Sequence, residues 1–182
     1  MVLTYSKYNR LKKGDFAPEF ELKGVDDKIH SLAEFKGKNL LIIFICNHCP
    51  YVQPKFEYLN ELQEKYKNLQ IIGINSNSPE IESDDSFESM KEYAEDINFK
   101  FLYLFDETQK TALKYGAVCT PDPFLFDSEH KLVYHGRLDD AHLGEHEEAD
   151  SAEIEEALQQ LIEGKEVTIK EEPSCGCNIK WK

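Results

Sequence analysis

The chain has 182 residues and a formal net charge of −14 at pH 7. Its length fits one globular domain with a substantial core, and its acidity argues against nucleic acids and anionic membrane surfaces as partners. No apolar run approaches the roughly 20 residues of a membrane helix, and the first 13 residues lack the hydrophobic segment of a signal peptide. We therefore expect a cytoplasmic protein in a reducing compartment, where a Cys-x-x-Cys is more often catalytic or metal-binding than a permanent crosslink.

The first predicted element is a β-hairpin. Residues 16–22 alternate apolar and polar side chains, residues 24–28 supply turn-forming Gly and Asp, and residues 29–32 form the returning strand. One helical turn is expected over residues 31–35, closed by Gly37. The hairpin therefore forms an N-terminal extension of the fold that follows.

The most informative stretch comes next. Six consecutive apolar residues, 40–45, lead directly into Cys46-Asn47-His48-Cys49. Such a run predicts a strand that is buried on both faces. Apolar residues then recur at helical spacing, at Val52, Phe56, Leu59 and Tyr66. We therefore predict that a helix begins at the cysteines, with Pro50 in its first turn and Pro54 as a kink.

Two cysteines at the N-terminus of a helix define a candidate redox pair. The helix dipole and the free N–H groups at that position favour thiolate over thiol. Cys46 is the candidate nucleophile, because the first sulfur of such a pair tends to be exposed. Cys49, one turn later and closer to the core, would resolve the mixed disulfide. His48 either lowers the pKa of Cys46 as a cation and makes the disulfide a better oxidant, or is an exposed turn residue without catalytic effect.

The remaining residues predict an alternation of strands and helices. Residues 69–75 form a second buried strand, which a right-handed crossover places parallel to the first. Asp85 and Glu88 fit a capping box at the start of the next helix. The other predicted elements are a strand at 101–105, a helix at 108–115 that stops at Gly116, a hairpin at 124–136, and a helix at 154–162 capped by Asp150 and Glu153 and ended by Gly164. The pattern predicts the α/β class, with a central mixed sheet and helices on both faces.

A second candidate site element is Thr120-Pro121, which directly precedes a predicted strand. A proline with a fixed φ and no N–H can bring the backbone groups of the preceding residue towards a substrate backbone. Periodicity alone leaves both the cis and the trans form open. Cys119 could reach the site as an accessory redox residue, or it could pack as a small buried side chain.

Residues 167–182 form a predicted C-terminal tail, separate from a domain that spans residues 1–166. The tail carries Cys175-Gly-Cys177 and Trp181. Two cysteines one residue apart form a strained disulfide, so they are expected to pair elsewhere or to remain thiols. Trp181 favours a docked tail, because a lone tryptophan is costly to leave in water. A docked tail could bring one of its cysteines to the Cys-x-x-Cys pair, and the alternative is a frayed tail.

These motifs resemble the thioredoxin superfamily, and within it the redoxin (AhpC/TSA-like) branch of peroxiredoxin-like proteins. The resemblance covers nearly the whole chain, and the segments that carry it are residues 46–52, 120–127, 135–140 and 176–182. It implies a thioredoxin-like fold. It also implies that the Thr120–Pro121 bond is cis, and that its loop faces the cysteines and holds the substrate.

The chain departs from two well-known members of that superfamily. A peroxiredoxin has Pro-x-x-x-Thr/Ser-x-x-Cys, and with Cys49 as that cysteine the Thr/Ser position holds Cys46 and the Pro position holds Ile42. Thioredoxin has Trp before its first cysteine and a buried acid in the preceding strand, where this chain has Ile45 and Leu40. Neither reaction cycle can therefore be transferred unchanged.

The sequence predicts a thiol–disulfide oxidoreductase in which Cys46 attacks, Cys49 resolves, His48 tunes and Thr120-Pro121 holds the substrate. Its partners would be protein or small-molecule disulfides and thiols, with a thioredoxin or glutathione system as reductant and no cofactor. One alternative is an antioxidant hydroperoxide reductase with a tail cysteine as resolver. Another is a copper- or zinc-binding module in which Cys46, His48 and Cys49, together with the tail cysteines, supply the ligands.

Overall fold

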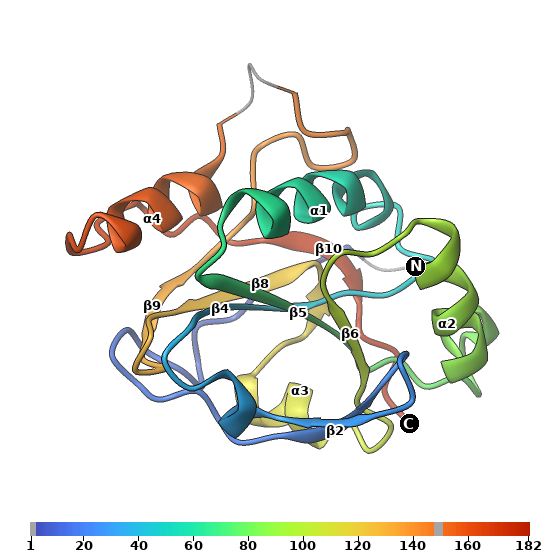
Figure 1. Cartoon of the computed structure of the whole chain (residues 1–182). Coiled ribbons are helices and arrows are strands. Elements are labelled where there is room, and N and C mark those ends of the chain that lie inside the picture. The colour runs from blue at the N-terminus through green and yellow to red at the C-terminus, as the bar shows by residue number, and fades with distance from the viewer. Residues whose placement is uncertain (1–2, 148–150) are drawn as a thin grey trace.

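A computed structural model describes residues 3–147 and 151–182, and its centre is a seven-stranded mixed sheet (Figure 1). The strand order is β3-β2-β6-β5-β4-β8-β9. These strands are β2 (Glu21–Gly24), β3 (Ile29–Ser31), β4 (Asn39–Phe44), β5 (Leu69–Asn75), β6 (Leu102–Phe105), β8 (Asp122–Phe126) and β9 (Leu132–His135). β4, β5 and β6 pair parallel with one another, and every other pairing in this sheet is antiparallel. The predicted mixed sheet and N-terminal hairpin are confirmed.

β4 lies between β5 and β8 and is buried along its whole length. Its register places Ile42 opposite Ile72 on β5 and opposite Phe124 on β8. A strand that is hydrogen-bonded on both edges and covered on both faces has to be apolar throughout. This environment explains the apolar run of residues 40–45, and it leaves the carboxyl end of the strand as the place where the cysteines emerge.

Helices cover both faces of the sheet (Figure 1). The elements on one face are α1 (Phe56–Lys65), α2 (Phe87–Asp96) and α4 (Glu153–Ile162), and those on the other are α3 (Lys110–Tyr115) and the 3-10 helix η1 (Leu32–Phe35). Successive side chains of a strand point to opposite faces, so Leu41 and Ile43 enter the first core while Leu40, Ile42 and Phe44 enter the second. Across residues 3–147 and 151–182, none of the helices is long and apolar enough to cross a bilayer.

A second sheet joins distant parts of the chain. Its antiparallel order is β1 (Leu3–Tyr5), β10 (Cys175–Asn178) and β7 (Cys119–Thr120). The tail is therefore docked rather than frayed. Ile179 is 1% exposed in the second core, and Trp181 packs against the margin of the same core. Because β7 directly precedes β8, the docked tail lies at the end of the central sheet where the cysteines are.

The prediction that a helix begins at the cysteines is wrong. A turn and the 3-10 helix η2 (Gln53–Lys55) intervene, and α1 begins at Phe56. Pro50 and Pro54 explain the delay, because neither has an N–H to donate to the preceding turn. Pro54 accordingly lies before α1 and does not kink it.

Two predicted caps also need correction. The N-cap of α2 is Ser86, whose side chain accepts a hydrogen bond from the Ser89 N–H, and Asp85 has a different role. α4 begins at Glu153 without a side-chain cap, and Asp150 lies outside the described residues. The strand predicted from residue 16 shortens to β2, because Phe16 makes only an isolated bridge.

Candidate redox site

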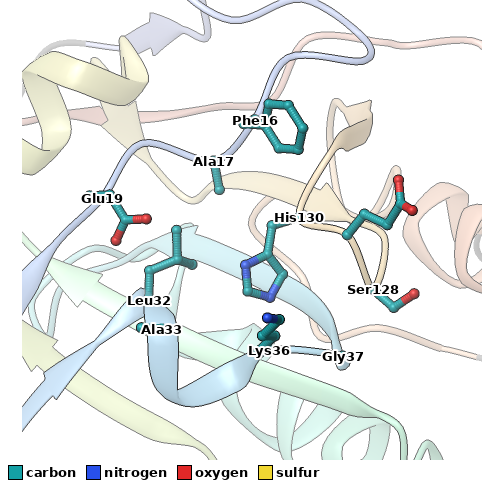
Figure 2. Close-up of a pocket in the computed structure, with 10 residues that line it drawn as sticks. Phe16, Ala17, Glu19, Leu32, Ala33, Lys36, Gly37, Ser128 and His130 are labelled. Carbon is teal, nitrogen blue, oxygen red and sulfur yellow. The ribbon is translucent and has the colours of Figure 1, made fainter.

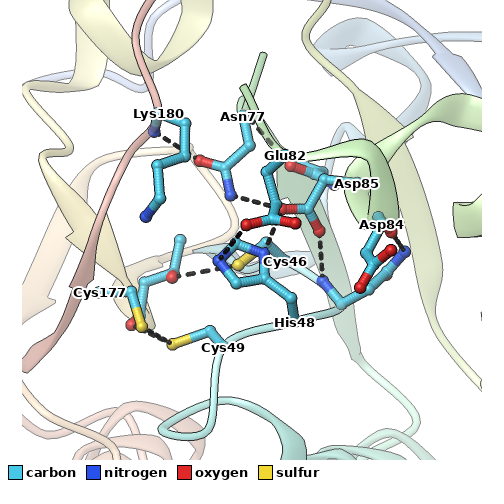
Figure 3. A network of polar contacts seen from close by, with 12 residues as sticks. Cys46, His48, Cys49, Asn77, Glu82, Asp84, Asp85, Cys177 and Lys180 are labelled. Carbon is cyan, nitrogen blue, oxygen red and sulfur yellow. Dashed lines mark hydrogen bonds and ion pairs between the residues drawn. The ribbon is translucent and has the colours of Figure 1, made fainter. Parts of the chain in front are cut away.

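The carboxyl end of β4, the Thr120–Pro121 loop and β10 meet at one place, and Figure 3 shows the three cysteines that gather there. Cys46 Sγ lies 3.4 Å from Thr120 Oγ1, and Cys49 Sγ lies 3.2 Å from the Thr120 carbonyl oxygen. Cys49 Sγ lies 3.0 Å from Cys177 Sγ. The Thr120–Pro121 bond is cis, the isomer that the family resemblance implies. The structure therefore agrees with the predicted alternative in which a docked tail brings one of its cysteines, here Cys177, to the pair.

One turn of backbone shapes the Cys-x-x-Cys segment. The Cys49 carbonyl accepts hydrogen bonds from the N–H groups of Val52 at 2.9 Å and Gln53 at 3.0 Å. Gln53 Nε2 in turn donates to the Asn47 carbonyl at 2.8 Å. This short turn takes the place of the predicted first turn of a long helix, and both of its cysteine sulfurs contact Thr120.

The three clustered thiols are closed off from solvent. Cys46, Cys49 and Cys177 are each 0% exposed, and all five cysteines of the chain are free thiols. The expectation that Cys46 is exposed is therefore wrong. β10 lies over the pair because it is hydrogen-bonded to β7, the strand that carries Thr120.

Burial and hydrogen bonding shift the pKa values of these three thiols in different directions. Burial raises the pKa of Cys46 well above its usual value. A hydrogen bond from Cys46, joined by one from Cys177, lowers the pKa of Cys49 to about 5 in spite of its burial. Burial raises the pKa of Cys177 to about 12. Burial therefore disfavours a thiolate on Cys46, and hydrogen bonds from the neighbouring thiols favour one on Cys49. The Thr120 carbonyl oxygen, which can only accept, is by contrast a partner for Cys49 as a thiol. The sequence predicts the thiolate on Cys46.

A buried carboxylate organises the other side of the cysteine turn. Asp85 is 0% exposed, and it accepts hydrogen bonds from the Asn47 N–H at 2.8 Å, Asn77 Nδ2 at 2.7 Å and His48 Nδ1 at 2.5 Å (Figure 3). The hydrogen bond to Asp85 raises the pKa of His48, and the negative charge of Glu82 adds to the effect. His48 is thus held by a buried carboxylate that favours its protonated form, and it is not an exposed turn residue.

Sequence reasoning missed Asp85 as a site residue. It lies in a run of acidic and serine residues, 82–86, in which no pattern marks one carboxylate as buried. Its partner Asn77 is equally inconspicuous in a polar loop. The sequence gives only an indirect indication. Thioredoxin has a buried acid in the strand before its cysteines, and this chain has Leu40 there, so a buried acid beside the cysteines has to come from another segment.

The two remaining cysteines differ in their surroundings. Cys119 is buried, its sulfur lies 3.8 Å from the Pro121 carbonyl oxygen, and burial raises its pKa. It fits the alternative of a small packed side chain. Cys175 is partly exposed, and its sulfur lies 3.5 Å from His142 Nδ1. Burial also raises the pKa of Cys175.

A buried ion pair supports the segment that follows the cysteines. Lys55 Nζ lies 2.8 Å from Asp139 Oδ1, and the two side chains are 3% and 1% exposed. Asp139 Oδ2 also contacts His146 Nδ1 at 3.1 Å, and the His146 ring stacks on Tyr58 at 4.1 Å. The acidic loop after β9 is thereby attached to η2 and α1. No sequence signal distinguishes Lys55 from an exposed lysine.

Cys46, His48 and Asp85 also form a possible metal site. One ligand atom from each lies within 4.8 Å of the other two. Thiolate, imidazole and carboxylate suit zinc. However, Asp85 already accepts three hydrogen bonds, and a metal ion would have to displace the one from His48. The ion would also have to displace the proton of the Cys46 thiol, and burial raises the pKa of that thiol. The arrangement therefore favours thiol chemistry over a resident metal.

The cysteine cluster is separate from a larger apolar hollow. That hollow has a volume of about 600 Å³ and lies between the N-terminal segment and the turn before β9, where Phe16, Leu32 and His130 line it (Figure 2). A smaller hollow of about 240 Å³ borders Asn47 and His48. Only the smaller one reaches the cysteine turn.

A mixed sheet whose central strand ends in a Cys-x-x-Cys turn, opposite a cis-proline loop, defines a thioredoxin-like protein. The fold is similar to the thioredoxin domain of a thiol-disulfide oxidoreductase from Bacteroides vulgatus, with a TM-score of 0.60 and 23% identity over 69% of this chain and 88% of that chain. More specifically, residues 13–135 match the AhpC/TSA family, and the chain belongs to this family.

Two relatives cover much or all of the chain. A solved structure of an uncharacterized conserved protein from Geobacillus kaustophilus is 40% identical, with a TM-score of 0.91 over 100% of this chain and 97% of that chain. The thiol-disulfide oxidoreductase ResA of Bacillus cereus (strain ATCC 10987 / NRS 248) is 27% identical over 131 residues, which are 71% of this chain and 72% of ResA. The first likeness includes the tail that the family match leaves out.

Proposed function

We propose that the protein is a cytoplasmic thiol–disulfide oxidoreductase that acts on protein or small-molecule disulfides. The observation that carries the proposal is the environment of Cys49. Its pKa is lowered to about 5, a second thiol hydrogen-bonds to it, and its sulfur lies against the backbone of a cis-proline loop. The name of its relative ResA, a thiol-disulfide oxidoreductase, supports the same activity.

In the first step, the Cys49 thiolate attacks one sulfur of a substrate disulfide. A bond forms between Cys49 and that sulfur, the substrate disulfide breaks, and the other substrate sulfur leaves as a thiolate. In the second step, Cys46 gives up its proton to the first substrate thiolate and attacks Cys49 Sγ. The Cys46–Cys49 disulfide forms, and the second substrate thiolate leaves. The substrate gains two electrons, and the protein loses two.

His48 and Asp85 assist the second step electrostatically. Forming a thiolate at Cys46 is unfavourable because the sulfur is buried. A ring nitrogen of His48 lies within 4.8 Å of Cys46 Sγ, and the hydrogen bond to Asp85 keeps that ring protonated to higher pH. An opposite charge at this distance stabilises the thiolate. A thioredoxin or glutathione system then reduces the Cys46–Cys49 disulfide to complete the cycle.

The assignment of roles is tested by trapping the mixed disulfide. In a Cys46→Ser/Cys177→Ser protein mixed with a peptide disulfide, the peptide should stay bonded to Cys49, because neither neighbouring thiol remains to release it. A Cys49→Ser protein should form no such adduct, and Cys119→Ala should behave as wild type. Mass spectrometry of the intact protein measures the adduct. An adduct in Cys49→Ser alone would restore the order in which Cys46 attacks.

Hydroperoxide reduction is a second candidate, favoured by the contact between Cys49 and Cys177. In that reaction the Cys49 thiolate takes one peroxide oxygen, becomes a sulfenic acid and releases an alcohol or water. Cys177 would then condense with it to give a Cys49–Cys177 disulfide and water. Turnover of hydrogen peroxide with a thiol reductant measures this activity. A Cys46→Ser protein should keep this activity through Cys177, and a Cys46→Ser/Cys177→Ser protein should lose it.

A further inference from the structure

The C-terminal strand occupies the edge of the cis-proline loop. β10 pairs antiparallel with β7, with Cys177 opposite Thr120 and Asn178 opposite Cys119. An extended peptide that adds to an open strand edge makes this kind of ladder. The tail therefore lies where an extended substrate would pair with the loop, and its own sulfur is 3.0 Å from Cys49 Sγ.

Gly176 permits this close approach. A Cβ at position 176 would lie 1.9 Å from the Thr120 carbonyl oxygen and 2.9 Å from the Thr120 carbonyl carbon. Both are backbone atoms, which cannot rotate away as a side chain could. Glycine at this position therefore lets the ladder form with Cys177 against Cys49, and any larger residue has to push the tail away from the loop.

Contacts fix the tail on both sides of Cys177. Before it, Ser174 Oγ donates to the carbonyl of the cis-proline at 2.6 Å. After it, the Lys180 N–H donates to Asn77 Oδ1 at 2.8 Å. Asn77 is also the residue whose Nδ2 donates to Asp85 at 2.7 Å. The tail is thus attached to the same polar network that holds His48 (Figure 3).

We propose that residues 174–180 are a built-in substrate segment, and that Cys177 exchanges disulfide bonds with Cys49. The inference rests on the proposed function, because its starting state is the Cys46–Cys49 disulfide. It adds a second intramolecular disulfide, Cys49–Cys177. It also makes external disulfides compete with the tail for one position beside the cis-proline loop.

The exchange balances without a further oxidant. Cys177 loses its proton and attacks Cys49 Sγ in the Cys46–Cys49 disulfide. The Cys49–Cys177 bond forms, the Cys46–Cys49 bond breaks, and Cys46 leaves as a thiolate that takes up the proton released by Cys177. One disulfide replaces another, and a substrate thiol or the reductant reopens either of them. The oxidised protein is therefore a mixture of two forms, one with the Cys46–Cys49 disulfide and one with the Cys49–Cys177 disulfide.

The test is a peptide map of the full chain after oxidation with glutathione disulfide and alkylation of free thiols. Trypsin cleaves after Lys38 and Lys55, and after Lys170 and Lys180, so the two cysteine segments fall on separate peptides. A bond between those peptides reports the exchange. We expect it in wild type and, in larger amount, in Cys46→Ser. The matched variant Cys175→Ser should keep this bond between the peptides, and Cys177→Ser should lose it.

A Gly176→Ala protein tests the placement of the tail with every thiol retained. We expect loss of the crosslinked peptides, retention of the Cys46–Cys49 disulfide, and faster reaction with glutathione disulfide than in wild type, because the tail no longer covers Cys49. Unfolding by urea confirms that the variant is folded. A crosslink as abundant as in wild type would show that the register of β10 is irrelevant to the exchange.

The outcomes separate the two proposals. If Cys46→Ser carries glutathione on Cys49 while Cys177 stays free, the built-in substrate is ruled out and the oxidoreductase stands, provided that wild type forms Cys46–Cys49. If Cys177→Ser forms no Cys46–Cys49 disulfide either, the proposed function itself fails. If the crosslink depends on Cys175 instead of Cys177, the assignment of the exchanging tail sulfur is overturned.

Discussion

The two segments that supply the clustered sulfurs are held in different ways. The Cys46–Cys49 turn continues β4, which is hydrogen-bonded on both edges and buried throughout. Cys177 Sγ lies 3.0 Å from Cys49 Sγ, but its strand is held by short ladders to β1 and β7 and by a glycine that fits against one carbonyl. One segment belongs to the central sheet, and the other is a short strand packed over the end of that sheet.

This difference shows how a buried thiol pair can still react. Both cysteines of the turn are 0% exposed, so a substrate reaches them only when a neighbouring element moves. Moving β4 would open the central sheet, whereas moving β10 breaks its short ladders to β1 and β7 and a few flanking contacts and leaves the central sheet paired. Elements that open locally are those whose loss leaves the rest of the fold intact. The tail is therefore the element best placed to control access.

Cys49→Ser should have the largest effect on both segments, because the Cys49 sulfur belongs to the Cys46–Cys49 and the Cys49–Cys177 disulfides. Activity with disulfide substrates should fall to background, and neither intramolecular disulfide should form. Insulin reduction and thiol mapping measure the two effects. Cys175→Ser, a change of one tail thiol outside the contact, is the control for the mapping. Substantial turnover in Cys49→Ser would mean that the chemistry lies elsewhere.

Asp139→Asn tests how much the buried Lys55–Asp139 ion pair stabilises the segment that follows the cysteines. The change leaves the buried Lys55 ammonium without its charged partner, and we expect a loss of about 3–5 kcal/mol in the free energy of unfolding. Urea denaturation measures it. The double variant Lys55→Met/Asp139→Leu should recover most of the loss, since no buried charge remains. A single variant within 1 kcal/mol of wild type, roughly the value of an exposed pair, would contradict the burial.

Two glycines give a matched pair of changes, one under each segment. In Gly73→Ala the new Cβ lies 2.5 Å from Ile45 Cδ1, the side chain directly before Cys46. Overpacking of this kind costs about 1–3 kcal/mol. Gly176→Ala should lower the free energy of unfolding by less, because the tail can move away while the core stays intact. Equal losses in urea denaturation would mean that tail and core unfold as one unit.

The smallest effect concerns His48, whose pKa is raised chiefly by its hydrogen bond to Asp85. A raised pKa of a basic group in the folded state stabilises the protein fully below the unfolded pKa, about 6.5 for histidine. That contribution is lost as the pH rises through the folded pKa. The difference in unfolding free energy between wild type and His48→Gln should therefore be largest at mildly acidic pH and shrink above neutrality. A difference that grows with pH would reverse the sign of the interaction.

The fold could be predicted because its strongest signals are local. The apolar run at 40–45, the strand at 69–75 and the stop at Gly116 each follow from burial or from a backbone angle, and the structure confirms all three. The start of α1 was misplaced because helical spacing of apolar residues continued through Pro50 and Pro54. Periodicity reports which side chains are buried, and it does not report which backbone groups can hydrogen-bond.

The candidate site was predictable only in part, because its partners are far apart in sequence. Cys46, Cys49 and Thr120 follow from a motif. The contact of Cys177 with Cys49 depends on a strand of four residues whose pairing no pattern specifies. The pKa shifts depend on the folded surroundings, because burial raises the pKa of Cys46 and hydrogen bonds from neighbouring thiols lower that of Cys49, whereas the motif favours a thiolate on Cys46. Asp85 was found only through the folded geometry.

The pairing of β10 between β1 and β7 also sets the order in which the molecule can be completed. The backbones of Ser6 and Ser174 are hydrogen-bonded at 2.9 Å although they are 168 residues apart. Because translation runs from the N-terminus, β4, the cysteine turn and β7 leave the ribosome before β10 does. Until then β1 and β7 are unpaired edges, and the two active sulfurs face their surroundings. The nascent protein thus acquires its reactive thiols before it acquires the strand that covers them.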